Sequence, residues 1–83
     1  MRGDFKYALN IAKKLREENI NTEVYFEDGK LGKKLEYANK RNIPFVIIIG
    51  EDEIKNGLIT LRDMNNKKQN TVDIKEAIEI IHS

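Results

Sequence analysis

The sequence predicts one α/β domain built as three layers, α/β/α, around a mixed and mainly parallel sheet of four strands. The first observation behind this prediction is the run 45–49, Phe-Val-Ile-Ile-Ile, which follows Pro44 and lacks polar alternation. Such a run is typical of a strand whose two faces are both covered. The second observation is the amphipathic helical stretches before and after this run. Their order, helix–strand–helix–strand–strand–strand–helix, favours helices packed on a sheet.

In the first half of the chain, apolar residues at helical spacing predict a helix over residues 5–18, with Asp4 as its N-cap. Asn19 can end this helix in the left-handed conformation, which asparagine tolerates. Residues that favour β-structure predict a strand over 21–26. The next expected elements are a turn at Asp28 and Gly29 and a second helix over 30–41.

The second half begins after the apolar run, where residues 51–56 form a predicted single helical turn that Gly57 ends. The connection to the next predicted strand, 58–62, is shorter than the dozen or so residues that a parallel crossover needs. We therefore expect the strands 45–49 and 58–62 to be antiparallel. The remaining expected elements are a turn at 65–68, an edge strand at 69–72 and a helix at 74–82 that Asp73 caps.

The composition is that of an ordinary globular domain, and we expect it in the cytoplasm. The chain has no cysteine, and its net charge of +1 at pH 7 does not by itself indicate a nucleic-acid partner. No apolar run approaches the ~20 residues that cross a bilayer, so we expect no membrane partner. Residues 1–4 lead directly into a helical pattern without the features of a secretory signal.

The carboxyl end of the apolar strand is the first place to expect a site, because ligands of α/β sheets gather at the carboxyl ends of strands. Gly50 and the acidic residues Glu51, Asp52 and Glu53 stand there. For Glu51 and Asp52 an equally good interpretation is that they begin a short helix, where negative charge interacts favourably with the helix dipole.

A distinctive series of segments extends over almost the whole chain: ALNIAKKLREENI, GKLGKKLEYANKRNIPFVIIIGEDEI, NGLITLRDM and the closing amphipathic helix. This series resembles the C-terminal anticodon-binding domain of class IIa aminoacyl-tRNA synthetases, and most of all that of histidyl-tRNA synthetase. The most specific piece is KLGKKLEYANKRNIPFVIIIGEDE, which joins a basic helix, Ile-Pro, an apolar strand and an acidic stretch.

The resemblance implies a domain with five strands, of which the first, central strand has no counterpart here. It also implies that residues 1–83 are one domain, a C-terminal fragment of an ATP-dependent histidine–tRNA ligase. A separate catalytic domain would bind ATP and histidine, so we expect neither a cofactor nor enzymatic activity in this domain. Its expected partner is tRNA, through the histidine anticodon stem-loop.

By resemblance, Glu53 and Arg62 are the residues that contact anticodon bases. A carboxylate can accept hydrogen bonds from the donors on the Watson–Crick edge of guanine, which the histidine anticodon contains. The Arg62 guanidinium suits guanine O6 and N7 or a phosphate. The alternative for Arg62 is a surface arginine paired with Glu53 or Asp63, which contributes little when exposed. We expect Glu53 and Arg62 at the same rim, where such a pair would orient both side chains.

Lysines and one tyrosine complete the expected RNA-binding residues. Lys30, Lys33 and Lys34 begin the second helix, near the carboxyl end of the preceding strand, where they can contact phosphates without recognising sequence. The alternative is that these lysines form only the solvated face of the helix. Tyr25 is out of phase with its apolar neighbours and is therefore the aromatic residue expected to face RNA bases. The other aromatic residues, Phe5, Tyr7, Phe26, Tyr37 and Phe45, are expected in or around the core.

No catalytic or metal-binding residue is predicted. His82 lacks an evident partner, and Ser83 is the only serine. The rival hypothesis is a non-catalytic protein-interaction or dimerisation module derived from the same fold. A sheet without its central strand would leave an unpaired groove or edge, which a second copy could fill to form a homodimer.

Overall fold

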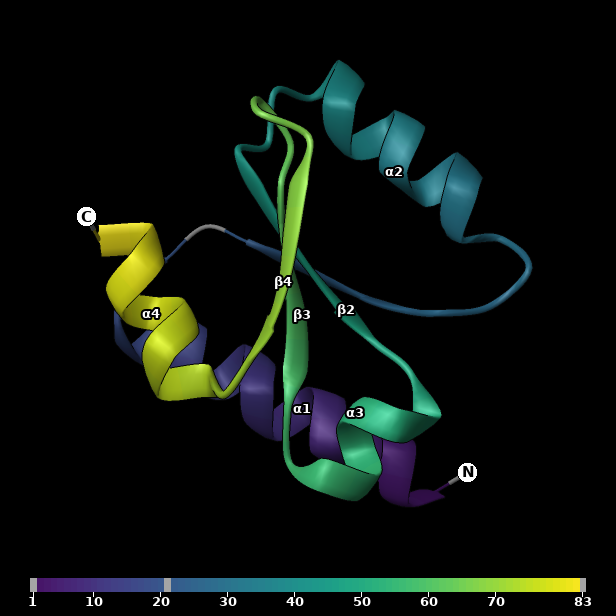
Figure 1. Cartoon of the computed structure of the whole chain (residues 1–83), viewed down its shortest axis with the longest axis vertical. Helices are drawn as coiled ribbons and strands as arrows, with labels where there is room; N and C mark the ends of the chain where they lie inside the picture. Colours follow the sequence, from purple (N-terminus) through teal and green to yellow (C-terminus); the bar gives the residue numbers. More distant parts are fainter. Residues whose placement is uncertain (1, 21, 83) are drawn as a thin grey trace.

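The computed structural model describes residues 2–20 and 22–82, with side chains from Phe5 onward. Figure 1 shows the helices lying on two sides of a twisted sheet. In chain order the elements are α1 (Arg2–Glu17), β1 (Glu23–Phe26), α2 (Leu31–Lys40), β2 (Phe45–Ile49), α3 (Glu51–Asn56), β3 (Ile59–Asp63), β4 (Lys68–Val72) and α4 (Ile74–His82).

The sheet contains four strands in the order β1-β2-β3-β4. Strand β1 is parallel to β2, whereas the pairs β2–β3 and β3–β4 are antiparallel. The predicted mixed sheet of four strands is therefore confirmed, and so is the antiparallel β2–β3 pair. The prediction that the sheet is mainly parallel is wrong. Only the β1–β2 connection, which contains α2, is long enough for a parallel crossover.

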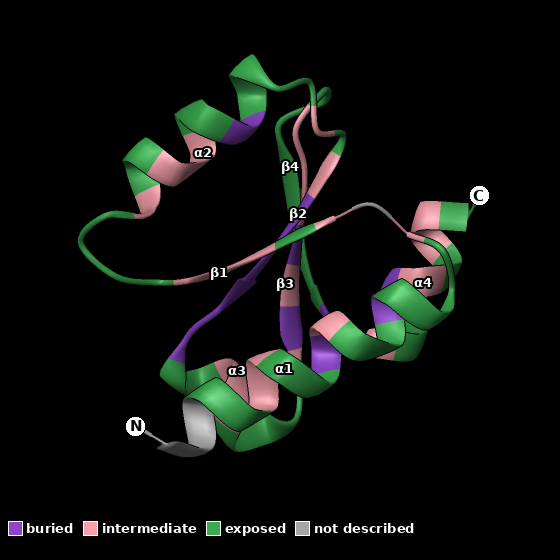
Figure 2. Ribbon diagram, turned by 180° about the vertical axis from the view of Figure 1, so that it is seen from behind, coloured by how far each residue is buried: buried purple, intermediate pink, exposed green. Residues whose placement is uncertain are grey.

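The predicted three layers are confirmed by two apolar clusters on opposite faces of the sheet. On one face, Val46 and Ile48 of β2 pack with Ala38 of α2. On the other face, Ile47 and Ile49 pack in the larger cluster, to which α1, α3 and α4 contribute. Figure 2 shows buried residues concentrated in β2 and β3, between these layers. A strand enclosed from both sides has no solvent-facing positions, which explains the absence of alternation in 45–49.

Helix ends follow the local sequence at most positions. Asn19 has φ 58° and Gly57 has φ 70°, so both end their helices in the left-handed conformation, as predicted. Asp73 caps α4: its Oδ1 accepts a hydrogen bond from the Glu76 N–H at 2.7 Å. The prediction for Asp4 is wrong, because α1 already begins at Arg2. No proline stands before Asp4, and Gly3 lowers helix propensity by only about 1 kcal/mol, so the first turn can extend beyond Asp4 toward the N-terminus.

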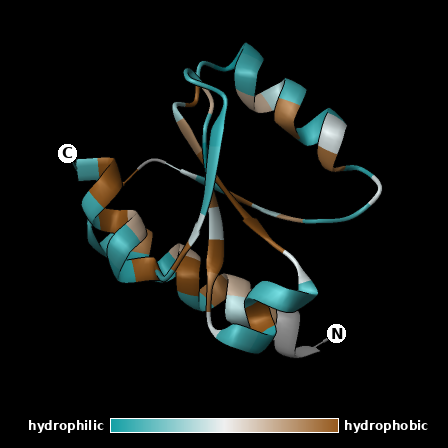
Figure 3. Ribbon diagram, viewed as in Figure 1, coloured by the Kyte–Doolittle hydropathy of each residue, from teal (hydrophilic) through white to brown (hydrophobic). Residues whose placement is uncertain are grey.

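Strand boundaries differ from the prediction by one or two residues. The first strand begins at Glu23 rather than at Asn21, which lies outside the described residues. Strand β3 is shifted by one residue toward the C-terminus. Strand β4 begins at Lys68, one residue before the predicted start, and it forms one edge of the sheet, as predicted. Figure 3 shows that β4 is hydrophilic along most of its length, which suits an edge strand that is covered on one side only.

Direct pairing of β1 with β2 leaves no open groove inside the sheet. The register joins Glu23 to Val46 and Phe26 to Ile49 without a gap. The rival hypothesis of an interaction module allowed an unpaired groove or an unpaired edge; the groove is absent from the described sheet, and the outer edge of β1 remains. Because the two strands are parallel, the segments that follow Phe26 and Ile49 emerge at the same edge of the sheet, which we call the carboxyl rim.

Candidate nucleic-acid interface

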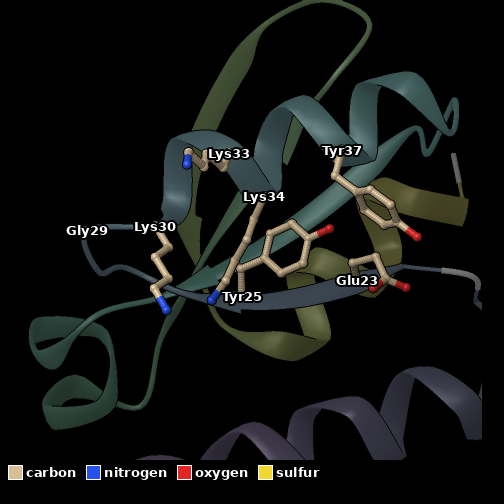
Figure 4. Close-up of a pocket in the computed structure, with 7 residues that line it drawn as sticks. All are labelled: Glu23, Tyr25, Gly29, Lys30, Lys33, Lys34 and Tyr37. Atoms are coloured by element: carbon tan, nitrogen blue, oxygen red, sulfur yellow. The ribbon is translucent and has the colours of Figure 1, made fainter.

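A groove between β1 and the side of α2 brings together four of the residues predicted to bind RNA. Its cavity has a volume of about 480 Å³, within the roughly 300–1,000 Å³ common for small-molecule sites. Figure 4 shows the Lys30 and Lys34 side chains reaching toward β1, while Lys33 extends from the helix above them. The residues that line this α2 groove are Glu23, Tyr25, Gly29, Lys30, Lys33, Lys34 and Tyr37.

Asp28 organises the loop that leads from β1 into this groove. Its Oδ1 accepts a hydrogen bond from the Lys30 N–H at 2.8 Å, and its Oδ2 lies 3.5 Å from Lys34 Nζ. The backbone hydrogen bond from Lys30, followed by the charge of Lys34, holds the pKa of Asp28 below its ordinary value. The turn predicted at this position therefore also orients Lys34, whose Nζ lies 6.0 Å from the centroid of the Tyr25 ring.

Tyr25 lies on the side of the sheet that faces α2, whereas its neighbours Val24 and Phe26 face the other side. Its ring packs against the smaller apolar cluster. Its hydroxyl is buried and has no hydrogen-bond partner among the described residues. Burial raises the pKa of Tyr25 above its ordinary value of 10.0, and the Glu23 carboxylate adds to this effect. With Lys34 over its ring, Tyr25 forms the floor of the groove and leaves little free face for a base.

Replacing Tyr25 by phenylalanine should stabilise the fold. The buried hydroxyl of Tyr25 lost its hydrogen bonds to water without gaining a partner, and such a group costs about 1–3 kcal/mol. We expect Tyr25→Phe to raise the free energy of unfolding by about 1 kcal/mol in urea denaturation. Tyr7→Phe is the matched control, because the Tyr7 hydroxyl donates to the Leu58 carbonyl at 2.8 Å. The control should lower the free energy of unfolding by about 1 kcal/mol. Equal losses in both variants would contradict the conclusion that the Tyr25 hydroxyl is buried without a partner.

Tyr37 and Glu23 are groove residues that the sequence analysis did not select. The Tyr37 side chain is 53% exposed rather than part of the core. Arg41 Nη1 donates to its hydroxyl at 2.8 Å, and the guanidinium lies 5.5 Å from the ring centroid. The spacing Lys33, Tyr37, Arg41 places these residues four apart on one helical face. That spacing is a signal from which Tyr37 could have been found.

Glu53 lies at the carboxyl rim, but one of its oxygens has a structural role. Its Oε1 accepts a hydrogen bond from the Gly50 N–H at 2.8 Å, which caps the start of α3. A Cβ on Gly50 would stand 2.9 Å from this oxygen and 2.9 Å from Glu27 Oε1, so two carboxylates flank the glycine. The Glu53 charge also contributes, after burial, to raising the pKa of Tyr7 on α1. Glu53 therefore faces the α1 side of the sheet.

Arg62 lies at the other end of the sheet and on its other face. It is paired in register with Val46, near the start of β2, whose side chain packs toward α2. The expectation that Glu53 and Arg62 meet at one rim is therefore wrong, and so is the proposed pair between them. Side-chain alternation along β3 also places Asp63 on the face opposite Arg62. Arg62 Nη1 instead donates to Gln69 Oε1 at 2.7 Å across the β3–β4 pair.

The described part of the chain contains neither a metal-binding cluster nor a membrane span. Within residues 2–20 and 22–82, no three His, Cys, Asp or Glu side chains gather in a way that could hold a metal ion. Over the same residues, no helix has the length and apolarity to cross a bilayer.

Solved structures place this fold in a defined class, the α/β domains of aminoacyl-tRNA synthetases. Histidyl-tRNA synthetase from Nostoc sp. PCC 7120 superposes with a TM-score of 0.79 at 32% identity, over 93% of this chain and 18% of that one. The RNA binding domain of threonyl-tRNA synthetase from Cryptosporidium parvum superposes with a TM-score of 0.80 over 94% of this chain and 20% of that one. Its 18% identity supports the shared fold alone.

The chain belongs to the anticodon binding domain family, which matches residues 3–83. It is 46% identical to the histidine–tRNA ligase of Clostridium tetani over 76 residues, which are 92% of this chain and 17% of that protein. Identity to the histidine–tRNA ligase of Pyrococcus horikoshii is 42% over 74 residues, 89% of this chain and 17% of that protein. The chain thus spans less than a fifth of the length of these relatives.

Proposed function

We propose that this domain binds the anticodon stem-loop of a histidine tRNA and so supports aminoacylation by a separate catalytic domain. The observation that carries the proposal is the α2 groove, in which cationic side chains surround two tyrosines. Lysines neutralise phosphates, and aromatic rings stack on the unpaired bases of RNA loops. Membership of the anticodon binding domain family and the similarity to histidine–tRNA ligases support this choice of RNA.

In the proposed arrangement this domain has no activity by itself. ATP and histidine would bind the catalytic part of a cytoplasmic enzyme, and this domain would supply affinity and selectivity for tRNA. Lys30, Lys33 and Lys34 would hold phosphates at the mouth of the groove. Glu53 and Arg62 each remain a predicted contact to an RNA base, but at two separate positions on the surface.

The test is a titration of the chain with two stem-loops that differ only in the anticodon. Fluorescence anisotropy should show tighter binding of the histidine anticodon than of the altered one. Glu53 should be tested as Glu53→Gln, because the amide oxygen can still accept the Gly50 N–H, whereas alanine would also remove the helix cap. Arg62→Ala serves as the second variant. Equal, weak binding of both stem-loops at every salt concentration would contradict the proposal.

The alternative function is a protein-interaction module, and one surface feature favours it. Phe5 and Leu9 are 63% and 52% exposed and lie four residues apart on α1, where they form a small apolar patch. The outer edge of β1 is also unpaired among the described residues. A homodimer formed through these surfaces would sediment as a dimer at high protein concentration, and a monomer would remove the dimerisation form of this alternative.

A further inference from the structure

The α2 groove does not end at the lysines. A second cavity of about 250 Å³ continues along α2, lined by Glu23, Tyr37, Arg41 and Ile43. Glu23 and Tyr37 line both cavities and therefore stand at their junction. Figure 4 shows the Glu23 carboxylate close to the Tyr37 ring, on the β1 side of the groove. The aromatic ring and the acid thus lie between lysines at one end and Arg41 at the other.

Tyr37 is better suited than Tyr25 to stack on a base. A cation lies over one face of each ring, but Tyr37 is still more than half exposed, whereas Tyr25 is half-buried with its hydroxyl enclosed. The hydrogen bond from Arg41 to the Tyr37 hydroxyl limits the rotation of the ring. A ring that is already held in place loses less conformational entropy when a base stacks on it.

Glu23 is the acceptor in a groove whose other charged residues are cations. Among the described residues, no hydrogen bond or ion pair engages its carboxylate oxygens, and the residue is exposed. Glu53, by contrast, has one oxygen occupied by the Gly50 N–H. A free carboxylate offers two adjacent acceptors, and guanine presents two adjacent donors, N1–H and the N2 amino group, on its Watson–Crick edge. Adenine presents an acceptor and a donor there, so one carboxylate oxygen would face an acceptor.

We infer that the junction of the α2 groove binds one unpaired guanine of an RNA loop, with its ring on Tyr37 and its Watson–Crick edge on Glu23. Lys30, Lys34 and Arg41 contact the flanking phosphates, because they lie at the two ends of the groove. This inference rests on the proposed RNA-binding function and names the base and the residue that selects it. Glu23, rather than Glu53, is then the main determinant of preference for guanine.

The experiment exchanges the base as well as the protein residue. Each guanine of a histidine-anticodon stem-loop is replaced in turn by adenine or by inosine, which lacks the N2 amino group. For one of these positions, the unmodified protein should prefer guanine over adenine by about tenfold, the usual range for a bidentate contact. Inosine at that position should weaken binding severalfold.

Glu23→Gln should abolish or reverse this preference. The glutamine amide offers one donor and one acceptor, so it complements adenine and can no longer accept from both the N1–H and the N2 amino group of guanine. The inosine effect should disappear in the same variant, and Tyr37→Ala should weaken all loops about equally. Glu36→Gln on α2 is the matched control: it removes the same charge outside the groove and should leave the guanine preference unchanged.

The outcomes separate this inference from the proposed function. An unchanged guanine preference in Glu23→Gln, with RNA binding that still depends on the lysines, would overturn the inference and leave the proposed function intact. No binding of any stem-loop would overturn both. The inosine substitution requires no change to the protein, so the prediction stays falsifiable even if a variant fails to fold.

Discussion

Ile47→Ala is expected to remove about 2–5 kcal/mol from the free energy of unfolding, the range for truncating a large buried aliphatic side chain. Ile47 is 0% exposed and lies in the middle of β2, within the larger apolar cluster. A cavity there loses contacts from the sheet and from the helices that cover it. A domain of 83 residues has a total stability of roughly 4–12 kcal/mol, so this single substitution should remove a large fraction of it.

Urea denaturation followed by circular dichroism measures this effect. Ile47→Val is the control, because it removes one methylene group and keeps the β-branched shape, and it should cost about 0.5–1.5 kcal/mol. Lys55→Ala on the exposed side of α3 should change stability by less than about 0.5 kcal/mol. A loss below about 1 kcal/mol for Ile47→Ala would mean that β2 is not the enclosed centre of the domain.

The double variant Lys33→Ala/Lys34→Ala should weaken RNA binding by roughly 10- to 30-fold near 0.1 M salt. Affinity falls as salt rises, and each phosphate contact on single-stranded RNA contributes about −0.7 to the slope of log affinity against log salt. Loss of two contacts should therefore make the slope shallower by about 1.4. Histidine-anticodon and altered stem-loops should be affected alike, since phosphates carry no sequence information. Anisotropy titrations at several salt concentrations give both the affinity and the slope.

Lys13→Ala/Lys14→Ala is the matched control for this prediction. It removes the same two charges from α1, which covers the face of the sheet opposite α2. If the α2 groove holds the RNA, this control should keep the slope of the unmodified protein. Identical slopes in the two double variants would instead indicate that RNA responds to net charge alone, without a defined binding surface.

Local features of the chain were predictable from the sequence. The apolar run 45–49 is enclosed on both faces, and Asn19, Gly57 and Asp73 end or cap helices where their chemistry predicts. Each of these outcomes depends on a residue and its immediate neighbours, through backbone strain, a short hydrogen bond or hydrophobic periodicity. Family membership was predictable for a related reason, because it too is carried by continuous segments of sequence.

Tertiary structure alone decided which residues share a surface. Glu53 and Arg62 are nine positions apart and both polar, yet they lie on opposite faces and at opposite ends of the sheet. Glu23 and Tyr37, on different elements, line the same groove. Which residues share a surface depends on strand direction, on register and on the packing of α2 on the sheet. All three depend on contacts between segments that are remote in the sequence. The sequence by itself therefore determined the elements and the class of domain, whereas the composition of the site followed from how those elements pair.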